Sequence, residues 1–224
     1  IYNDEIVDAH ALCNKAKESG IDAVIASDPA VITYARSIGL SVHMSVQANV
    51  CNNESGRFFS QFADVMVLAR ELRLSHTREI IDFIERENIR GPAGEKIRIE
   101  IFAHGALCVA VSGKCYMSLA AYNASANRGS CYQSCRRAYR VIDEETGYEL
   151  ELDNKYVMSP KDICTIRVLD QLIEAGVSIF KLEGRGRSSD YVYTTTQVYK
   201  EAASACIKDN YTAEKISEWE ERLS

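Results

Sequence analysis

Cysteines gather in one part of this sequence, and their spacing is typical of a metal site. Five of the eight lie between residues 108 and 164. They are Cys108, Cys115, Cys131, Cys135 and Cys164. Four thiolates can hold a structural zinc ion or an iron–sulfur cluster. The usual zinc signature pairs two Cys-x2-Cys sequences, which this chain lacks. The spacing therefore favours a cluster, with unliganded thiols as the alternative.

A cysteine hydrolase is the competing interpretation of the same stretch. His104 precedes Cys108 by four residues, so the two side chains could lie close together. A nucleophilic cysteine needs a histidine within hydrogen-bond reach, oriented by a third group, and an oxyanion hole. The sequence marks neither the third group nor the hole. The other three histidines fall in predicted helices or strands, where structural roles are expected; they are His10, His43 and His76.

An arginine-rich segment follows the first cysteines. It contains Arg128, Arg136, Arg137 and Arg140, with Tyr132 and Tyr139 between them. Guanidinium groups bind phosphates and aromatic rings stack on bases, so this composition is typical of RNA binding. The alternative is a solvated loop whose arginines pair with the acidic residues at 143–145.

The elements that must position these residues alternate between strand and helix. Short apolar runs predict strands at residues 23–26, 42–46, 65–69, 97–102 and 178–182. Continuous apolar strands separated by helices indicate a parallel sheet covered on its faces. A β-hairpin is predicted over 139–157. Ser159 followed by Pro160 predicts the start of a helix that ends at Gly176. Thr212 opens a last amphipathic helix.

Polar residues follow each predicted strand at the end where parallel βα folds place their function. They are Ser27 and Asp28, Gln47 and Asn49, Arg70 and Glu71, His104 and Cys108, and Glu183 and Arg185. Each alone could be an ordinary loop residue. Together they would line one rim, where Gln47, Arg70 and Arg185 could bind an anion.

The bulk composition limits the class of protein. A net charge of −6 gives no general attraction to nucleic acid, so RNA binding would need a local basic patch. No apolar run is long enough for a membrane helix. Many cysteines without a visible secretion signal favour a reducing compartment, and hence a cytoplasmic protein.

Longer motifs resemble a known family. The stretch E-I-F-A-H-G-A-L-C-V-A-V-S-G-K-C-Y-M-S at 100–118 is similar to the signature of the collagenase-like peptidases of unknown catalytic type, peptidase family U. R-G-S-C-Y-Q-S-C-R, S-P-K-D-I-C and F-K-L-E-G-R are further matches, so the resemblance covers the whole chain.

The resemblance implies a TIM-barrel-like core. A complete barrel of this type has eight strands, and five are predicted here. We therefore expect a barrel that is incomplete at the N-terminus. Residues 1–209 would form it, with a cysteine-rich insertion and hairpin at about 105–158 and a helical tail at 210–224.

The resemblance also implies an activity, the 5-hydroxylation of the tRNA wobble uridine. A 4Fe–4S cluster would be bound by Cys108, Cys115, Cys131 and Cys164, with Cys135 as the alternative fourth ligand. The expected site residues are Gln47, Arg70, His104, Glu183 and Arg185, with prephenate as co-substrate and tRNA as partner. A peptidase using Cys108 or a metal, and a non-catalytic RNA-binding module, remain alternatives.

Overall fold

The computed structural model of the chain describes residues 1–151 and 161–224. These residues form two compact units. The first comprises residues 1–105 and 164–224, and the second comprises residues 106–163.

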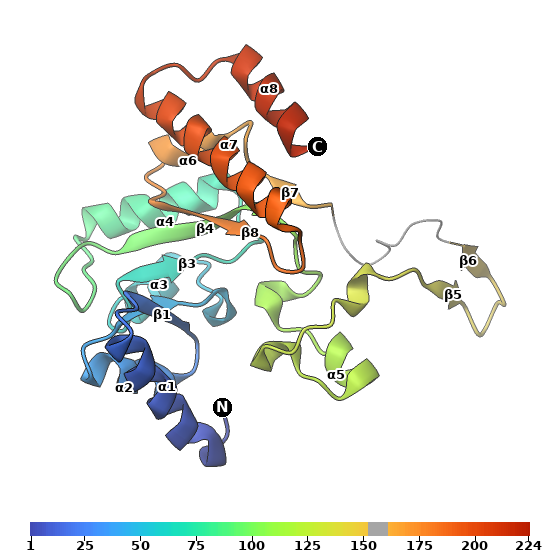
Figure 1. The fold of residues 1–224 in the computed structure, drawn as a ribbon, viewed down its shortest axis with the longest axis horizontal. Helices are drawn as coiled ribbons and strands as arrows, with labels where there is room; N and C mark the ends of the chain where they lie inside the picture. The colour runs from blue at the N-terminus through green and yellow to red at the C-terminus, as the bar shows by residue number, and fades with distance from the viewer. Residues whose placement is uncertain (152–160) are drawn as a thin grey trace. The chain divides into compact units, whose positions relative to one another are not determined.

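The first unit is built on a parallel sheet (Figure 1). Its strands are β1 (Ala23–Ala26), β2 (Ser41–Met44), β3 (Val65–Val67), β4 (Arg98–Gly105), the short β7 (Ile163–Cys164) and β8 (Ile179–Glu183). The order is β1-β2-β3-β4-β7, and β8 also pairs with β4. All five predicted strands are present, and the pairs from β1 to β4 and between β4 and β8 are parallel. This half-barrel confirms the predicted fold class.

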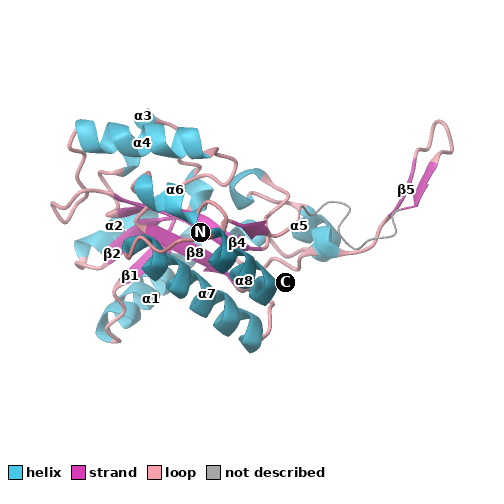
Figure 2. Cartoon of the chain, turned by 90° about the horizontal axis from the view of Figure 1, so that it is seen from above, coloured by secondary structure: helices cyan, strands magenta, loops and turns pink. Residues whose placement is uncertain are grey.

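Helices connect and cover the strands (Figure 2). In the first unit they are α1 (Ile6–Glu18), α2 (Pro29–Ser37), α3 (Asn53–Phe59), α4 (Leu74–Arg86), α6 (Leu169–Glu174), α7 (Ser189–Ile207) and α8 (Ala213–Leu223). Helix α2 begins at an Asp-Pro pair: the Asp28 carboxylate accepts the Ala30 backbone N–H, and Pro29 occupies the first helical position.

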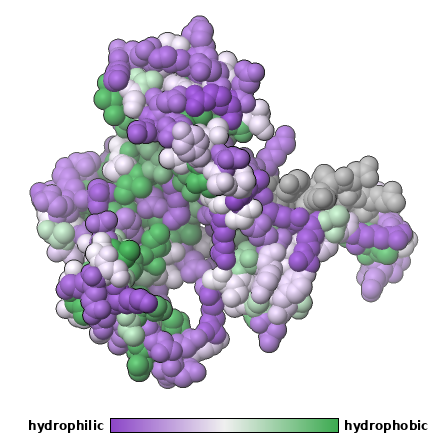
Figure 3. All heavy atoms as spheres, viewed as in Figure 1, coloured by the Kyte–Doolittle hydropathy of each residue, from purple (hydrophilic) through white to green (hydrophobic). Residues whose placement is uncertain are grey.

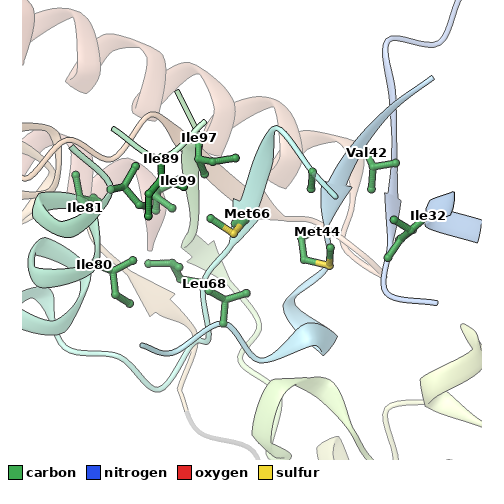
Figure 4. Packing of buried hydrophobic residues seen from close by; sticks show 14 of the residues in the cluster. Ile32, Val42, Met44, Met66, Leu68, Ile80, Ile81, Ile89, Ile97 and Ile99 are labelled. Atoms are coloured by element: carbon green, nitrogen blue, oxygen red, sulfur yellow. The ribbon is translucent and has the colours of Figure 1, made fainter. Parts of the chain in front are cut away.

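The sheet has one apolar face, which packs against the helices (Figure 4). Met44, Met66 and Ile99 are adjacent in register on β2, β3 and β4 and are almost fully buried. Ile32 of α2 and Ile80 of α4 belong to the same cluster. Each such side chain stabilises the fold by roughly 1.5–3 kcal/mol.

A second cluster lies under α6, α7 and α8, where Leu169, Val198 and Trp219 are buried. Not all apolar groups are covered: Figure 3 shows hydrophobic residues reaching the surface of the first unit among hydrophilic ones. Ile25 and Leu12 are examples of exposed apolar residues.

The second unit contains helix α5 (Met117–Tyr122), short 3-10 turns and a hairpin of β5 (Arg140–Ile142) and β6 (Glu149–Glu151). The hairpin strands are antiparallel, as predicted. At the turn the Asp143 carboxylate accepts the backbone N–H groups of Glu145 and Thr146. The predicted hairpin residues beyond 151 lie outside the described residues.

The predicted helix over 159–176 is wrong in its first half. Its proposed start at Ser159 and Pro160 lies outside the described residues, but residues 161–168 form the short β7 and a turn, and α6 begins at Leu169. Thr165 donates its backbone N–H to Ala103 of β4, and Ile166 is fully buried. Pairing with the sheet therefore prevails over the local helix signal. The stop at Gly176 is confirmed, since that residue adopts a φ of 91°.

Candidate functional site

A buried carboxylate occupies the second face of the sheet. Glu100 of β4 is only 4% exposed. Its Oε1 accepts a hydrogen bond from Lys181 Nζ of β8 at 3.2 Å, and its Oε2 lies 3.7 Å from His43 Nδ1 of β2. Burial raises the pKa of the Glu100 carboxyl, but hydrogen bonds from His43 and Lys181 and the Lys181 charge outweigh it, so the pKa lies below its ordinary value. Glu100 is therefore ionised at neutral pH.

Two cationic side chains, Arg70 and Lys181, contact the ring of Phe102. Arg70 follows β3, and its Cζ lies 4.8 Å from the centre of the Phe102 ring. Lys181 Nζ lies 5.5 Å from the centre of the same ring. Phe102 is directly opposite Lys181 in the β4–β8 register. The β4–β8 pairing thus places Lys181 beside the ring that Arg70 also contacts.

The other predicted rim residues follow the strands as expected. Gln47 accepts a hydrogen bond at Oε1 from Ser27 Oγ at 3.0 Å, which links the ends of β1 and β2. Glu183 accepts the backbone N–H of Arg185 at 2.9 Å and so stabilises the turn after β8. The Arg185 side chain is exposed.

His104 is placed inside the core. It is 5% exposed, and its ring packs on those of Tyr191 and Tyr199. Tyr199 Oη donates to the carbonyl of Ala103 at 2.9 Å and lies 3.4 Å from His104 Nδ1. Burial raises the pKa of Tyr199, which keeps the phenol protonated. This enclosure favours a positioning role for His104 over contact with a substrate.

Gly105 lets the chain leave β4. Its φ is 108°, and a Cβ at this position would lie 2.3 Å from the carbonyl oxygen of Glu183. Only glycine fits both the left-handed backbone and this close approach. The signature glycine therefore sets the path from the sheet strand into the cysteine segment.

Four of the five clustered cysteines belong to the second unit. Burial raises the pKa of the Cys135 thiol, and the charges of Cys108, Cys131 and Cys115 raise it further, while Arg136 opposes them. The other three thiols therefore lie within electrostatic reach of Cys135. Cys164 belongs to the first unit, where Tyr199 Oη lies 3.9 Å from its Sγ. The structure thus groups Cys135, the alternative fourth ligand, with the first three.

The loop around Cys115 is fixed by hydrogen bonds. The Met117 backbone N–H donates to Cys115 Sγ at 3.4 Å, and the Cys115 N–H donates to Asn127 Oδ1 at 3.1 Å. The Tyr132 N–H donates to Ser118 Oγ at 3.0 Å. An amide aimed at sulfur favours a thiolate and is one way in which proteins tune iron–sulfur clusters.

The cysteines could serve two kinds of metal centre, a single zinc ion or an iron–sulfur cluster. Among the described residues, no three Cys, His, Asp or Glu side chains stand close enough to hold one metal ion. Four thiolates on one zinc ion would lie about 3.8 Å apart, given Zn–S bonds of about 2.3 Å. In a four-iron cluster each sulfur binds a different iron, so the cysteines stand further apart. What the second unit supplies is four cysteine thiols, and thiolates are the donors that an iron–sulfur cluster takes.

The predicted RNA-binding arginines have different environments. Arg136 donates to Asp162 and to the carbonyl of Leu107, and Arg140 pairs with Glu149. These acids are not the ones at 143–145 that the sequence suggested as partners. Arg128 is exposed.

Arg137 of the second unit stacks on an aromatic ring. Its Cζ lies 4.8 Å from the centre of the Tyr122 ring, which is in contact with Tyr132. Both tyrosines are exposed. Arg137, Tyr122 and Tyr132 thus form an exposed cationic and aromatic surface, which we call the Arg–Tyr surface.

Sequence reasoning missed Glu100 and Lys181 and assigned His43 a structural role. A signal was present, because a charged residue in the middle of an apolar strand usually has a reason to be there. Glu100 in R-I-E-I-F and Lys181 in I-F-K-L-E both fit this description.

Comparison with known proteins gives relatives of two kinds. The chain is 50% identical over its whole length to a protein named collagenase from Porphyromonas gingivalis, of which it covers 54%. It is 35% identical to a 23S rRNA 5-hydroxycytidine synthase of Escherichia coli, over 93% of the chain and 30% of that protein. It is 33% identical to tRNA hydroxylation protein P1 of Bacillus subtilis, over 92% of the chain and 48% of that protein.

The chain spans about half the length of the first curated relatives it matches. No solved structure matches it. Among the described residues, no helix is long and apolar enough to cross a membrane. The profile described as Peptidase family U32 matches residues 1–224. The resemblance seen in the signature is thus confirmed, and the chain belongs to peptidase family U32.

Proposed function

We propose that the protein acts in iron–sulfur-dependent RNA hydroxylation, with the wobble uridine of tRNA as its target. The observation that carries this proposal is the second unit, which holds both four of the clustered cysteines and the Arg–Tyr surface. The first provides ligands for a redox centre and the second provides groups that bind single-stranded RNA. The relatives named for tRNA and rRNA hydroxylation support this combination.

Cys108, Cys115 and Cys131 would provide three cluster ligands, and the fourth would come from Cys164 or Cys135. A bound 4Fe–4S cluster would supply electron transfer. The chain's own part is to hold the thiolates and to direct the Met117 N–H at Cys115 Sγ. Arg137 and Tyr122 would bind the RNA by stacking on an unpaired base.

The anionic co-substrate belongs to the first unit in this proposal. Arg70, Gln47 and Arg185 follow strand ends, where their donors can bind a carboxylate such as that of prephenate. Glu183 orders the Arg185 turn through its backbone hydrogen bond. His104 would position Tyr199 and the end of β4.

The test is an anaerobic preparation of the chain incubated with iron, sulfide, unmodified tRNA and prephenate. We expect absorbance near 400 nm and the gain of one oxygen atom at the wobble uridine, detected by mass spectrometry of nucleosides. Cys108→Ser should lose both signals. Cys206→Ser changes a half-buried cysteine of α7 and should retain both. Hydroxylation that survives Cys108→Ser would contradict the proposal.

Proteolysis is a second candidate, because half of the residues are identical to those of a protein named collagenase. Gelatin cleavage that is lost in Cys108→Ser and survives iron chelation would favour it. RNA binding with steep salt dependence and neither activity would instead indicate a binding module.

A further inference from the structure

Arg70 is a half-buried arginine that contacts the face of the sheet carrying Glu100. In the described part of the chain, the Arg70 guanidinium makes no hydrogen bond or ion pair, and its contact is with the Phe102 ring. A guanidinium has five N–H donors that suit a carboxylate or phosphate. Withdrawing it from water without an anionic partner is costly, which points to a ligand that supplies the anion.

Lys181 contacts the same ring as Arg70 and has N–H donors that are not used within the described residues. One of the three N–H groups of an ammonium is used by Glu100 at 3.2 Å. Glu100 in turn is held by His43 on its other oxygen. This pair of contacts holds the ammonium 5.5 Å from the centre of the Phe102 ring, the ring that Arg70 also contacts.

We infer that Arg70 and Lys181, together over the Phe102 ring, form a binding site for the carboxylate group of a small molecule, in which Glu100 and His43 are positioning residues. The charges favour a carboxylate over a phosphate. Two cations and one carboxylate leave a single net positive charge, which matches one carboxylate group of a ligand better than a doubly charged phosphate group. The inference deepens the proposed function by assigning its anionic co-substrate to these residues.

The binding can be measured without a cluster, RNA or turnover, so its failure is distinct from failure of the proposed function. Pyruvate and inorganic phosphate are titrated into the isotope-labelled chain, and amide shifts are followed by NMR. We expect pyruvate to shift amides around Phe102 and Lys181 and to bind more tightly than phosphate. Arg70→Met should weaken pyruvate binding by about tenfold or more, the loss expected for a charge-assisted hydrogen bond.

Arg98→Met is the matched control, since Arg98 is an exposed arginine at the opposite end of β4. It should bind pyruvate as the unmodified chain does. The double variant Lys181→Met with Glu100→Gln removes the second cation without leaving a buried unpaired charge. Its affinity for pyruvate should also fall by about tenfold. Equal binding by the chain and Arg70→Met would overturn the inference. So would tighter binding of phosphate, shifts elsewhere, or no pyruvate binding.

Discussion

Replacing Lys181 by methionine should destabilise the first unit more than replacing its partner Glu100 by glutamine. The Glu100 side chain is 6% exposed, whereas that of Lys181 is 26% exposed. Removing the ammonium leaves a buried carboxylate without its main counter-charge, while removing the carboxylate leaves an ammonium that can still reach water. Breaking a fully buried ion pair costs about 3–5 kcal/mol.

Because Lys181 is partly solvated, we discount that range to about 2–3 kcal/mol for Lys181→Met. For Glu100→Gln we expect a destabilisation of about 1 kcal/mol, because the amide oxygen of the glutamine can still accept a hydrogen bond from Lys181. The free energy of unfolding of the double variant should lie within about 1 kcal/mol of that of the original chain, because burying a neutral pair costs little. The free energy of unfolding in urea, measured for all four proteins at neutral pH, gives the coupling energy.

Acid provides a second readout of the same pair. The pKa of Glu100 is lowered in the folded chain, so its contribution to stability is present above the ordinary carboxyl pKa and is lost as the pH falls through the folded value. The penalty of Lys181→Met should therefore shrink on acidification. If Glu100→Gln cost more than Lys181→Met, or if the penalty grew in acid, the assignment of Glu100 as a buried, ionised partner would be wrong.

Three further changes test other parts of the structure. Gly105→Ala places a Cβ against the Glu183 carbonyl and should cost more than about 2 kcal/mol in urea unfolding; an unchanged midpoint would contradict the close approach. Tyr199→Phe removes the hydroxyl that binds the Ala103 carbonyl and should cost about 1–3 kcal/mol, whereas Tyr193→Phe on the exposed side of α7 should cost little. Arg137→Gln should weaken binding of single-stranded RNA and lower the slope of log affinity against log salt by about 0.7, and an unchanged slope would remove Arg137 from the RNA surface.

The strands could be predicted because each is a short apolar run between helices, and burial on a parallel sheet requires little else. The start of helix α2 is encoded locally, by Asp28 as the N-cap and Pro29 at the first helical position. The helix expected from Ser159 failed because a distant partner, the Ala103 carbonyl of β4, takes the Thr165 N–H. Local capping chemistry does not encode that competition.

The charged face of the sheet could not be predicted for a similar reason. Glu100 and Lys181 are 81 residues apart, and only the β4–β8 register brings them into contact. The grouping of the cysteines was easier to foresee, since their closeness in sequence already implied it. Which thiol completes the set was left open, and Cys135→Ser and Cys164→Ser compared for the absorbance near 400 nm would decide it.

The buried pair on the sheet has a meaning beyond stability. An apolar pair of similar size would usually be no less stable than Glu100 with Lys181, because desolvation offsets most of the attraction between the charges. What an apolar pair could not do is hold an ammonium near the Phe102 ring that the guanidinium of Arg70 also contacts. In a chain with a net charge of −6, long-range attraction cannot gather anions, so a local site must provide its own cations. Placing them on a partly buried sheet face strengthens each contact with an anion, since water screens them less there.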